Sequence, residues 1–114
     1  MPNYNRVTLK EVRKAYKDTK TKPYRGAYFK GDGKRCCALA VLALTRNIDT
    51  SSDVVAWAQR KYGARYEEGF TCGFDYGQKA TLTKIAPHSA KYPRFVEGFK
   101  DGRRIAKALG VAGK

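Results

Sequence analysis

Two residue types in this 114-residue sequence could carry covalent chemistry, a cysteine and a histidine. Cys36 follows Lys34 and Arg35, and we predict that it lies in the first turn of a helix, where the cations and the helix dipole favour a thiolate. With His88 as the general base, this would be a small cysteine-dependent hydrolase or transferase. The alternative is that Cys36 and Cys37 are small apolar core residues, as free cysteines commonly are. We favour the second interpretation and predict no enzyme activity.

The same side chains could instead suggest a zinc site, made of Cys36, Cys37, Cys72 and His88. Their spacing lacks the paired C-x-x-C elements of structural zinc sites, so we predict no metal and no cofactor. An odd number of cysteines is also a poor disulfide framework and fits a reducing compartment. Because no apolar signal segment follows the first residue, we expect a cytoplasmic location.

Charge is the strongest indication of a binding function. The chain has 24 Lys and Arg against 10 Asp and Glu, a net charge of +14. Residues 1–35 carry eleven basic and three acidic groups, residues 36–75 four and five, and residues 76–114 nine and two. Such clustered charge costs stability, and a polyanionic partner compensates for it when phosphates are neutralised and counterions are released. If the positive charge served solubility alone, an even distribution of charge along the chain would serve equally well.

Aromatic rings alternate with cations between residues 18 and 35. Tyr24, Tyr28 and Phe29 could stack on bases while neighbouring Lys and Arg side chains follow a phosphate backbone. The alternative is that these rings anchor a loop to the core. Gly31-Asp32-Gly33-Lys34-Arg35 then precedes the next predicted helix, where free backbone N–H groups favour a phosphate. This loop lacks the Gly-Lys-Ser/Thr ending of a Walker loop, so it indicates a backbone phosphate more than a nucleotide.

The element that must position these groups is an apolar run at residues 36–44. It is rich in Ala and Leu and is apolar on every side, which predicts a buried central helix over about 34–46. A membrane span needs about 20 such residues, so we expect no membrane partner. Thr8 and Glu11 form a capping box that starts the first helix. Further helices are predicted over about 52–62, 64–77 and 93–109.

Two of the predicted helices share a pattern of glycine and phenylalanine. Residues 68–73 read Glu-Gly-Phe-Thr-Cys-Gly, and residues 97–102 read Glu-Gly-Phe-Lys-Asp-Gly. Glycine inside a helix costs up to about 1 kcal/mol relative to alanine, so this pattern indicates a very close approach of another backbone. We therefore expect the two helices to pack against each other through their glycines, with the phenylalanines reaching the central helix.

Together these patterns predict a mainly α fold. We expect a compact bundle of four to five helices around the central helix, with a short β-hairpin or extended segment at about 24–30. Residues 1–114 form a single domain in this prediction, and residues 1–6 and 111–114 are flexible ends.

The predicted function is that of a small basic nucleic-acid-binding protein with weak sequence specificity. It would contact the phosphate backbone through basic ridges on the first and last helices and through the Gly/Lys/Arg loop. DNA and RNA are both left open, as is the oligomeric state. The residues that we predict to make the contacts are Lys20, Lys22, Tyr24, Arg25, Tyr28, Lys30, Lys34, Arg35, Arg103, Arg104 and Lys107.

An alternative function follows from the general appearance of the chain. In size, charge and Gly-Phe-rich helices it resembles small phage-encoded or mobile-element proteins. That resemblance implies a protein-interaction module that inhibits a host nucleic-acid-handling or defence complex. Its partner would be an acidic or nucleic-acid-loaded protein complex, with little affinity for free DNA or RNA.

Overall fold

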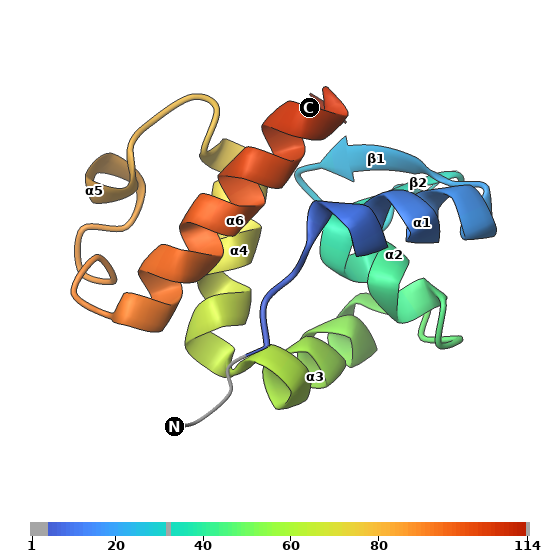
Figure 1. Cartoon of the computed structure of the whole chain (residues 1–114), viewed down its shortest axis with the longest axis horizontal. Helices are drawn as coiled ribbons and strands as arrows, with labels where there is room; N and C mark the ends of the chain where they lie inside the picture. The colour runs from blue at the N-terminus through green and yellow to red at the C-terminus, as the bar shows by residue number, and fades with distance from the viewer. Residues whose placement is uncertain (1–4, 32, 114) are drawn as a thin grey trace.

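The computed structural model describes residues 5–31 and 33–113. These residues form a mainly helical fold with a small sheet, which confirms the predicted fold class (Figure 1). Along the chain the elements are α1 (Leu9–Thr19), β1 (Lys22–Arg25), β2 (Arg35–Cys36), α2 (Ala38–Leu44), α3 (Ser51–Tyr62), α4 (Ala64–Tyr76), α5 (Leu82–Ile85), α6 (Pro93–Leu109) and β3 (Ala112–Gly113). In the described part of the chain, no helix is long and apolar enough to span a membrane.

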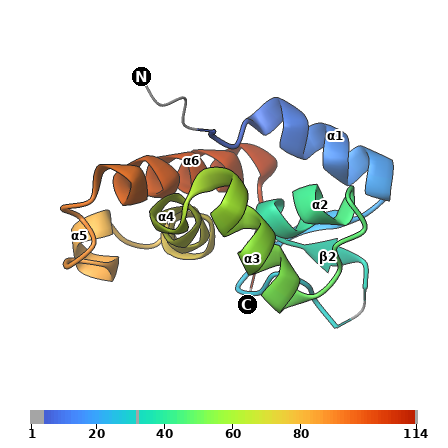
Figure 2. The ribbon, with the colours of Figure 1, turned by 90° about the horizontal axis from the view of Figure 1, so that it is seen from below.

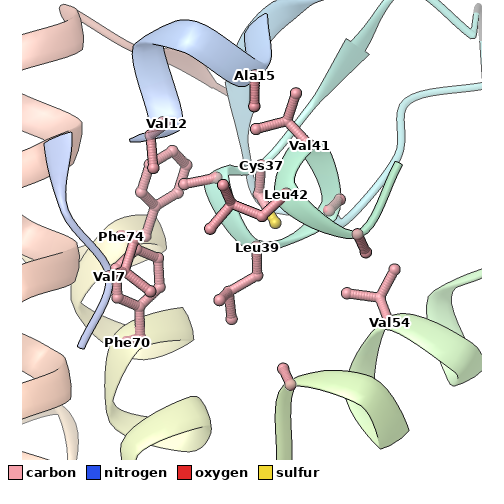
Figure 3. Packing of buried hydrophobic residues seen from close by; sticks show 14 of the residues in the cluster. Val7, Val12, Ala15, Cys37, Leu39, Val41, Leu42, Val54, Phe70 and Phe74 are labelled. Carbon is pink, nitrogen blue, oxygen red and sulfur yellow. The ribbon is translucent and has the colours of Figure 1, made fainter. Parts of the chain in front are cut away.

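Helix α2 is the buried centre of the fold, as predicted, but it is shorter than predicted. Residues 38–43 are all buried, and their side chains meet α1, α3 and α4 (Figure 3). The helix begins at Ala38 instead of about 34, because Arg35 and Cys36 pair with β1 as the strand β2. The backbone N–H of Cys37 then donates to the carbonyl of Tyr28 at 2.8 Å, so the chain enters the helix from an extended segment.

The small sheet has the order β2-β1-β3, and both pairings are parallel. β1 covers residues 22–25, so the extended segment predicted at about 24–30 begins earlier and is shorter, and Phe29 adds an isolated antiparallel bridge to Cys36. β3 follows α6 directly and pairs Ala112 with Tyr24. The sheet therefore fastens the C-terminal end of α6 to the segment after α1 (Figure 1).

Helices α4 and α6 pack through their glycines, which confirms the prediction from the repeated pattern. An added Cβ at Gly73 would lie 2.1 Å from the carbonyl oxygen of Phe99, and one at Gly102 would lie 2.3 Å from that of Phe70. Gly69 and Gly98 are equally close to the opposite backbone. Figure 2 shows α4 nearly end-on beside α6. Phe70 and Phe74 of α4 reach the core around α2, as predicted, but Phe99 of α6, although buried, does not belong to that cluster, so this part of the prediction is wrong.

The chain ends were predicted to be flexible over residues 1–6 and 111–114. Residues 1–4 and 114 lie outside the described residues. Within the described part, the guanidinium of Arg6 donates twice to the buried carboxylate of Asp101 on α6, at 3.0 and 2.7 Å. The Tyr66 hydroxyl donates to the same carboxylate at 2.5 Å and accepts from the N–H of Val7 at 2.9 Å. We call this group of four residues the N-terminal latch, since it fastens the start of the chain across α4 and α6.

Candidate functional site

The outer face of α6 carries four cations at helical spacing. Lys100, Arg103, Arg104 and Lys107 are all exposed and follow the i, i+3, i+4, i+7 pattern that places side chains on one face. They lie away from Gly98 and Gly102, which face α4. Together with Gln78 and Ala108 the four cations line an open hollow of about 580 Å³, which we call the α6 hollow. Of the described residues that line it, none is acidic.

Contacts within the fold hold the backbone and the stem of Arg103 in place, and of the four cations Arg104 lies near a carboxylate. The Gln78 side-chain amide donates to the backbone carbonyl of Arg103 at 2.9 Å, and the Arg103 stem packs against Gly77. Arg104 lies 3.4 Å from Asp101, which Arg6 also engages. Four like-charge pairs at helical spacing cost about 1 to 2 kcal/mol in total. A bound anion would relieve this repulsion.

Helix α1 carries the other basic ridge predicted from the sequence, but its surroundings are mixed in charge. Lys14 forms an ion pair with Asp18 at 2.7 Å, four residues further along the helix. The nearby hollow between α1, α2 and α3 has a volume of about 210 Å³ and includes Glu11 as well as Asp18. An anion entering this hollow would meet these carboxylates, whereas the described residues that line the α6 hollow include none, so the α6 hollow is the better anion site of the two.

The sheet brings together most of the other predicted binding residues. Lys22 and Arg35 are partners in the β1–β2 register. The Lys30 ammonium lies 5.2 Å from the centre of the Tyr24 ring, and the Arg35 guanidinium lies 5.5 Å from it. The cation–π contacts hold positive charge at this edge of the fold. Lys34 precedes β2 and is exposed, and Lys20 is the exposed C-cap of α1, two residues before β1.

Tyr28 anchors its loop to the rest of the fold. The sequence left this open as the alternative to stacking on bases. Its hydroxyl donates to the carboxylate of Glu67 at 2.8 Å. Glu67 is only 4% exposed and also accepts from Gln59 and Thr71, both at 3.0 Å. Burial is the main cause that raises the pKa of Tyr28, and the bond to Glu67 raises it further. These bonds anchor the loop after β1 to α4 and hold the Tyr28 hydroxyl inside the fold.

The glycine-rich loop before the central helix does not lie at a helix N-terminus. That prediction is wrong, because β2 and Cys37 separate Lys34 from the first residue of α2. The loop therefore cannot present the free N–H groups of a first helical turn to a phosphate. Lys34 and Arg35 keep their place on the surface beside β1, and Asp32 lies outside the described residues.

A smaller hollow lies between the end of β1 and the end of α4 and contains residues that sequence reasoning missed. It has a volume of about 100 Å³ and is lined by Arg25 and Gly26 from the end of β1 and by Asp75, Tyr76 and Lys79 from the end of α4. Gln78, in the same turn, lines the α6 hollow. A tyrosine three residues before a lysine, at the end of the helix predicted over about 64–77, is the one sequence signal in this turn, and it does not show that the tyrosine is exposed.

The three thiols occupy environments that oppose ionisation. Cys36 lies in β2 and is 1% exposed, and burial raises its pKa, so the prediction of a favoured thiolate is wrong. Burial is also the main cause that raises the pKa of Cys37 and Cys72. In the described part of the chain, no group of three or more His, Cys, Asp and Glu side chains could hold a metal ion. His88 is exposed in the turn after α5.

We expect slow alkylation of all three cysteines at pH 7. A raised pKa keeps each thiol protonated at neutral pH, and the thiolate is the reacting form. Cys72 should react first, since it is half-buried while the other two are buried. Mass spectrometry after timed exposure to iodoacetamide, with a urea-unfolded sample as the fast control, measures this order. One rapidly modified thiol at Cys36 would contradict it.

Comparison with family models, with curated proteins and with solved structures found no match for this chain. The class of protein is therefore defined by the fold and the surface alone. It is a small helical protein whose last long helix presents a cationic hollow beside a cation-rich sheet.

Proposed function

We propose that this protein binds nucleic acid through phosphate contacts, made mainly by the α6 hollow and extended by the cations beside the sheet. The observation that carries the proposal is the lining of the hollow, in which Lys100, Arg103, Arg104 and Lys107 meet without an acidic residue among the described lining residues. Positive charges brought this close are unfavourable alone and favourable against a polyanion.

The length of the cationic face supports a polyanion over a single small anion. From Lys100 to Lys107 the helix rises about 10 Å, at about 1.5 Å per residue. That distance corresponds to about three nucleotide steps at about 3.4 Å per step of a strand in B-form DNA. The Arg side chains can also bind phosphate through two parallel hydrogen bonds. Several successive phosphates can therefore be contacted from this one face.

The contacts that this surface offers are to phosphates, so we propose weak sequence specificity. Lys and Arg contacts to the backbone fix position and orientation but carry no base information. The free cysteines agree with a reducing compartment, and we propose the cytoplasm as the location.

Removing two of the four charges tests the proposal. We expect the Arg103→Gln/Lys107→Gln protein to bind nucleic acid more weakly than the unaltered protein. On single strands, its slope of log affinity against log salt concentration should fall by about 0.7 for each phosphate that is no longer neutralised. Glutamine keeps the part of the Arg103 stem that packs against Gly77, so the fold should be retained. Fluorescence anisotropy of labelled DNA and RNA oligonucleotides across a salt series measures both quantities.

The matched control is Lys10→Gln/Arg60→Gln, which removes two exposed charges from α1 and α3. It should lower the net charge equally and leave the salt slope nearly unchanged. If the control weakens binding as much as the α6 variant, general charge attraction explains the binding and the hollow is not the site. Circular dichroism confirms that each variant is folded.

An acidic or nucleic-acid-loaded protein complex remains the alternative partner. Carboxylates on the surface of a partner protein would neutralise the same cations. A protein that needs such a partner surface would not bind the free oligonucleotides of the salt series. Negligible binding of all oligonucleotides at physiological salt would therefore contradict our proposal. It would favour the alternative of an interaction module that inhibits a nucleic-acid-handling complex.

A further inference from the structure

We infer that Tyr76 is a base-stacking residue, which gives this protein a preference for single-stranded nucleic acid over duplex. The inference rests on the proposed function and names its substrate class. Tyr76 is the last residue of α4 and is 52% exposed, and it is the only large apolar side chain that is exposed in the described part of the chain.

The exposure of Tyr76 distinguishes it from the tyrosines that the fold uses. The hydroxyl of Tyr16 donates to the carbonyl of Cys36 at 2.6 Å, Tyr28 donates to Glu67, and Tyr66 donates to Asp101. Each of these three is held inside the fold by its bond. Tyr76 has no such bond in the described residues, and more than half of its surface faces solvent. Its ring is therefore accessible to a planar ligand.

The position of Tyr76 links the two cationic regions. Arg25 and Lys79 line the same small hollow as Tyr76, and Gln78, two residues further on, lines the α6 hollow. The acid in the small hollow, Asp75, accepts from the backbone N–H of Gly26 at 2.9 Å. A strand whose phosphates occupy the α6 hollow and then continue toward Arg25 passes this ring. An aromatic ring between cations is the arrangement that single-strand binding uses.

Stacking on Tyr76 requires an unpaired base. In a duplex each base is already stacked and paired, so its face reaches a side chain only if the nucleotide is flipped out at a free-energy cost. In a single strand the base can rotate onto the ring without breaking a pair. The phosphate contacts of α6 are available to both ligands, so the difference in affinity between them should come from Tyr76.

Tyr76→Ala should lower the affinity for a labelled 12-nucleotide single strand about tenfold, which is about 1.4 kcal/mol, and should leave the duplex of the same sequence nearly unaffected. Tyr76→Phe keeps the ring and should keep the affinity. A strand of the same length with abasic positions carries the same phosphates without bases. It should bind the unaltered protein about tenfold more weakly, and Tyr76→Ala should add little further loss on that strand.

Other results would overturn defined parts of the inference. Equal affinity of Tyr76→Ala and the unaltered protein for the single strand would overturn the role of Tyr76. The role would also be overturned if Tyr76→Ala lowered the affinity for the abasic strand and the duplex as much as the affinity for the single strand. In both cases the proposed function would stand, because phosphate binding is still observed. Failure of the unaltered protein to bind any oligonucleotide would overturn the inference and the proposed function together.

Discussion

Gly73→Ala should destabilise the protein by about 3 kcal/mol, the largest effect that we expect from adding a single methyl group. The new Cβ would lie 2.1 Å from the carbonyl oxygen of Phe99, so α4 and α6 would have to separate. Alanine is the better helix former by up to about 1 kcal/mol, and the expected loss exceeds that gain. Urea unfolding followed by circular dichroism measures the change, and the midpoint of thermal unfolding should fall by about 10 °C.

Gly31→Ala is the matched control for this substitution. Gly31 is exposed, its added Cβ would meet nothing within 4 Å, and its φ lies outside the left-handed region. The change in the free energy of unfolding should therefore be within about 0.5 kcal/mol of zero. If Gly73→Ala proved as harmless as this control, the close packing of α4 on α6 would be contradicted.

The second large effect is expected at Asp101, the centre of the N-terminal latch. Asp101→Asn should cost about 2 kcal/mol at neutral pH, because it removes the charged partner that Arg6 contacts at 3.0 and 2.7 Å and leaves the guanidinium only its longer ion pair with Glu97, at 3.5 Å. The cost is below that of a fully buried pair, since half of the Arg6 side chain faces solvent. The double variant with Arg6→Gln should be less destabilised than the sum of the single variants, and a simply additive result would contradict the pairing.

The latch also predicts how stability depends on pH. Burial alone would raise the pKa of Asp101, but the hydrogen bonds from Arg6 and Tyr66 outweigh it and lower the pKa. A carboxyl whose pKa is lower in the folded state stabilises the protein above its unfolded pKa of about 4, and this stability is lost as the pH falls below that value. The Asp101→Asn protein should lose less stability than the unaltered protein between about pH 5 and about pH 2, measured by urea unfolding.

Asp18→Asn serves as the control for the acid dependence. Asp18 also pairs with a cation, Lys14, but about half of its side chain is exposed. Exposed pairs contribute between about 0 and 1 kcal/mol, so this variant should follow the unaltered protein closely across the pH range. A similar effect of the two substitutions would mean that the latch does not differ from an ordinary surface ion pair.

The two faces of α6 have different physical roles. Gly98, Gly102 and Asp101 face the interior and hold the helix against α4 and the N-terminal segment. Lys100, Arg103 and Lys107 face outward and line the α6 hollow. Substitutions on the inner face should therefore change the free energy of unfolding, whereas substitutions on the outer face should change the salt dependence of binding.

Local signals in the sequence were sufficient for most of the helices. Thr8 caps α1 by accepting from the N–H of Glu11, as its capping box predicts, and α6 runs from Pro93 to the stop at Gly110. Such caps act between residues three or four positions apart, so they can be recognised without the fold. The glycine pairs of α4 and α6 were also predictable, because glycine within a helix costs stability unless another backbone comes close.

Only the tertiary structure could determine the sheet and the chemistry around it. β1 takes its partners from Arg35–Cys36 and from Ala112–Gly113, and strands of two residues carry no periodicity to detect. Because Cys36 pairs with β1, it is not part of the predicted helix. Burial, and not a helix dipole, therefore determines the direction of the pKa shift of Cys36. The sequence alone determined that this chain is helical and strongly basic. The hydrogen bond of Tyr28 to the buried Glu67, the exposure of Tyr76 and the lining of the α6 hollow depend on contacts between distant segments, which no local pattern specifies.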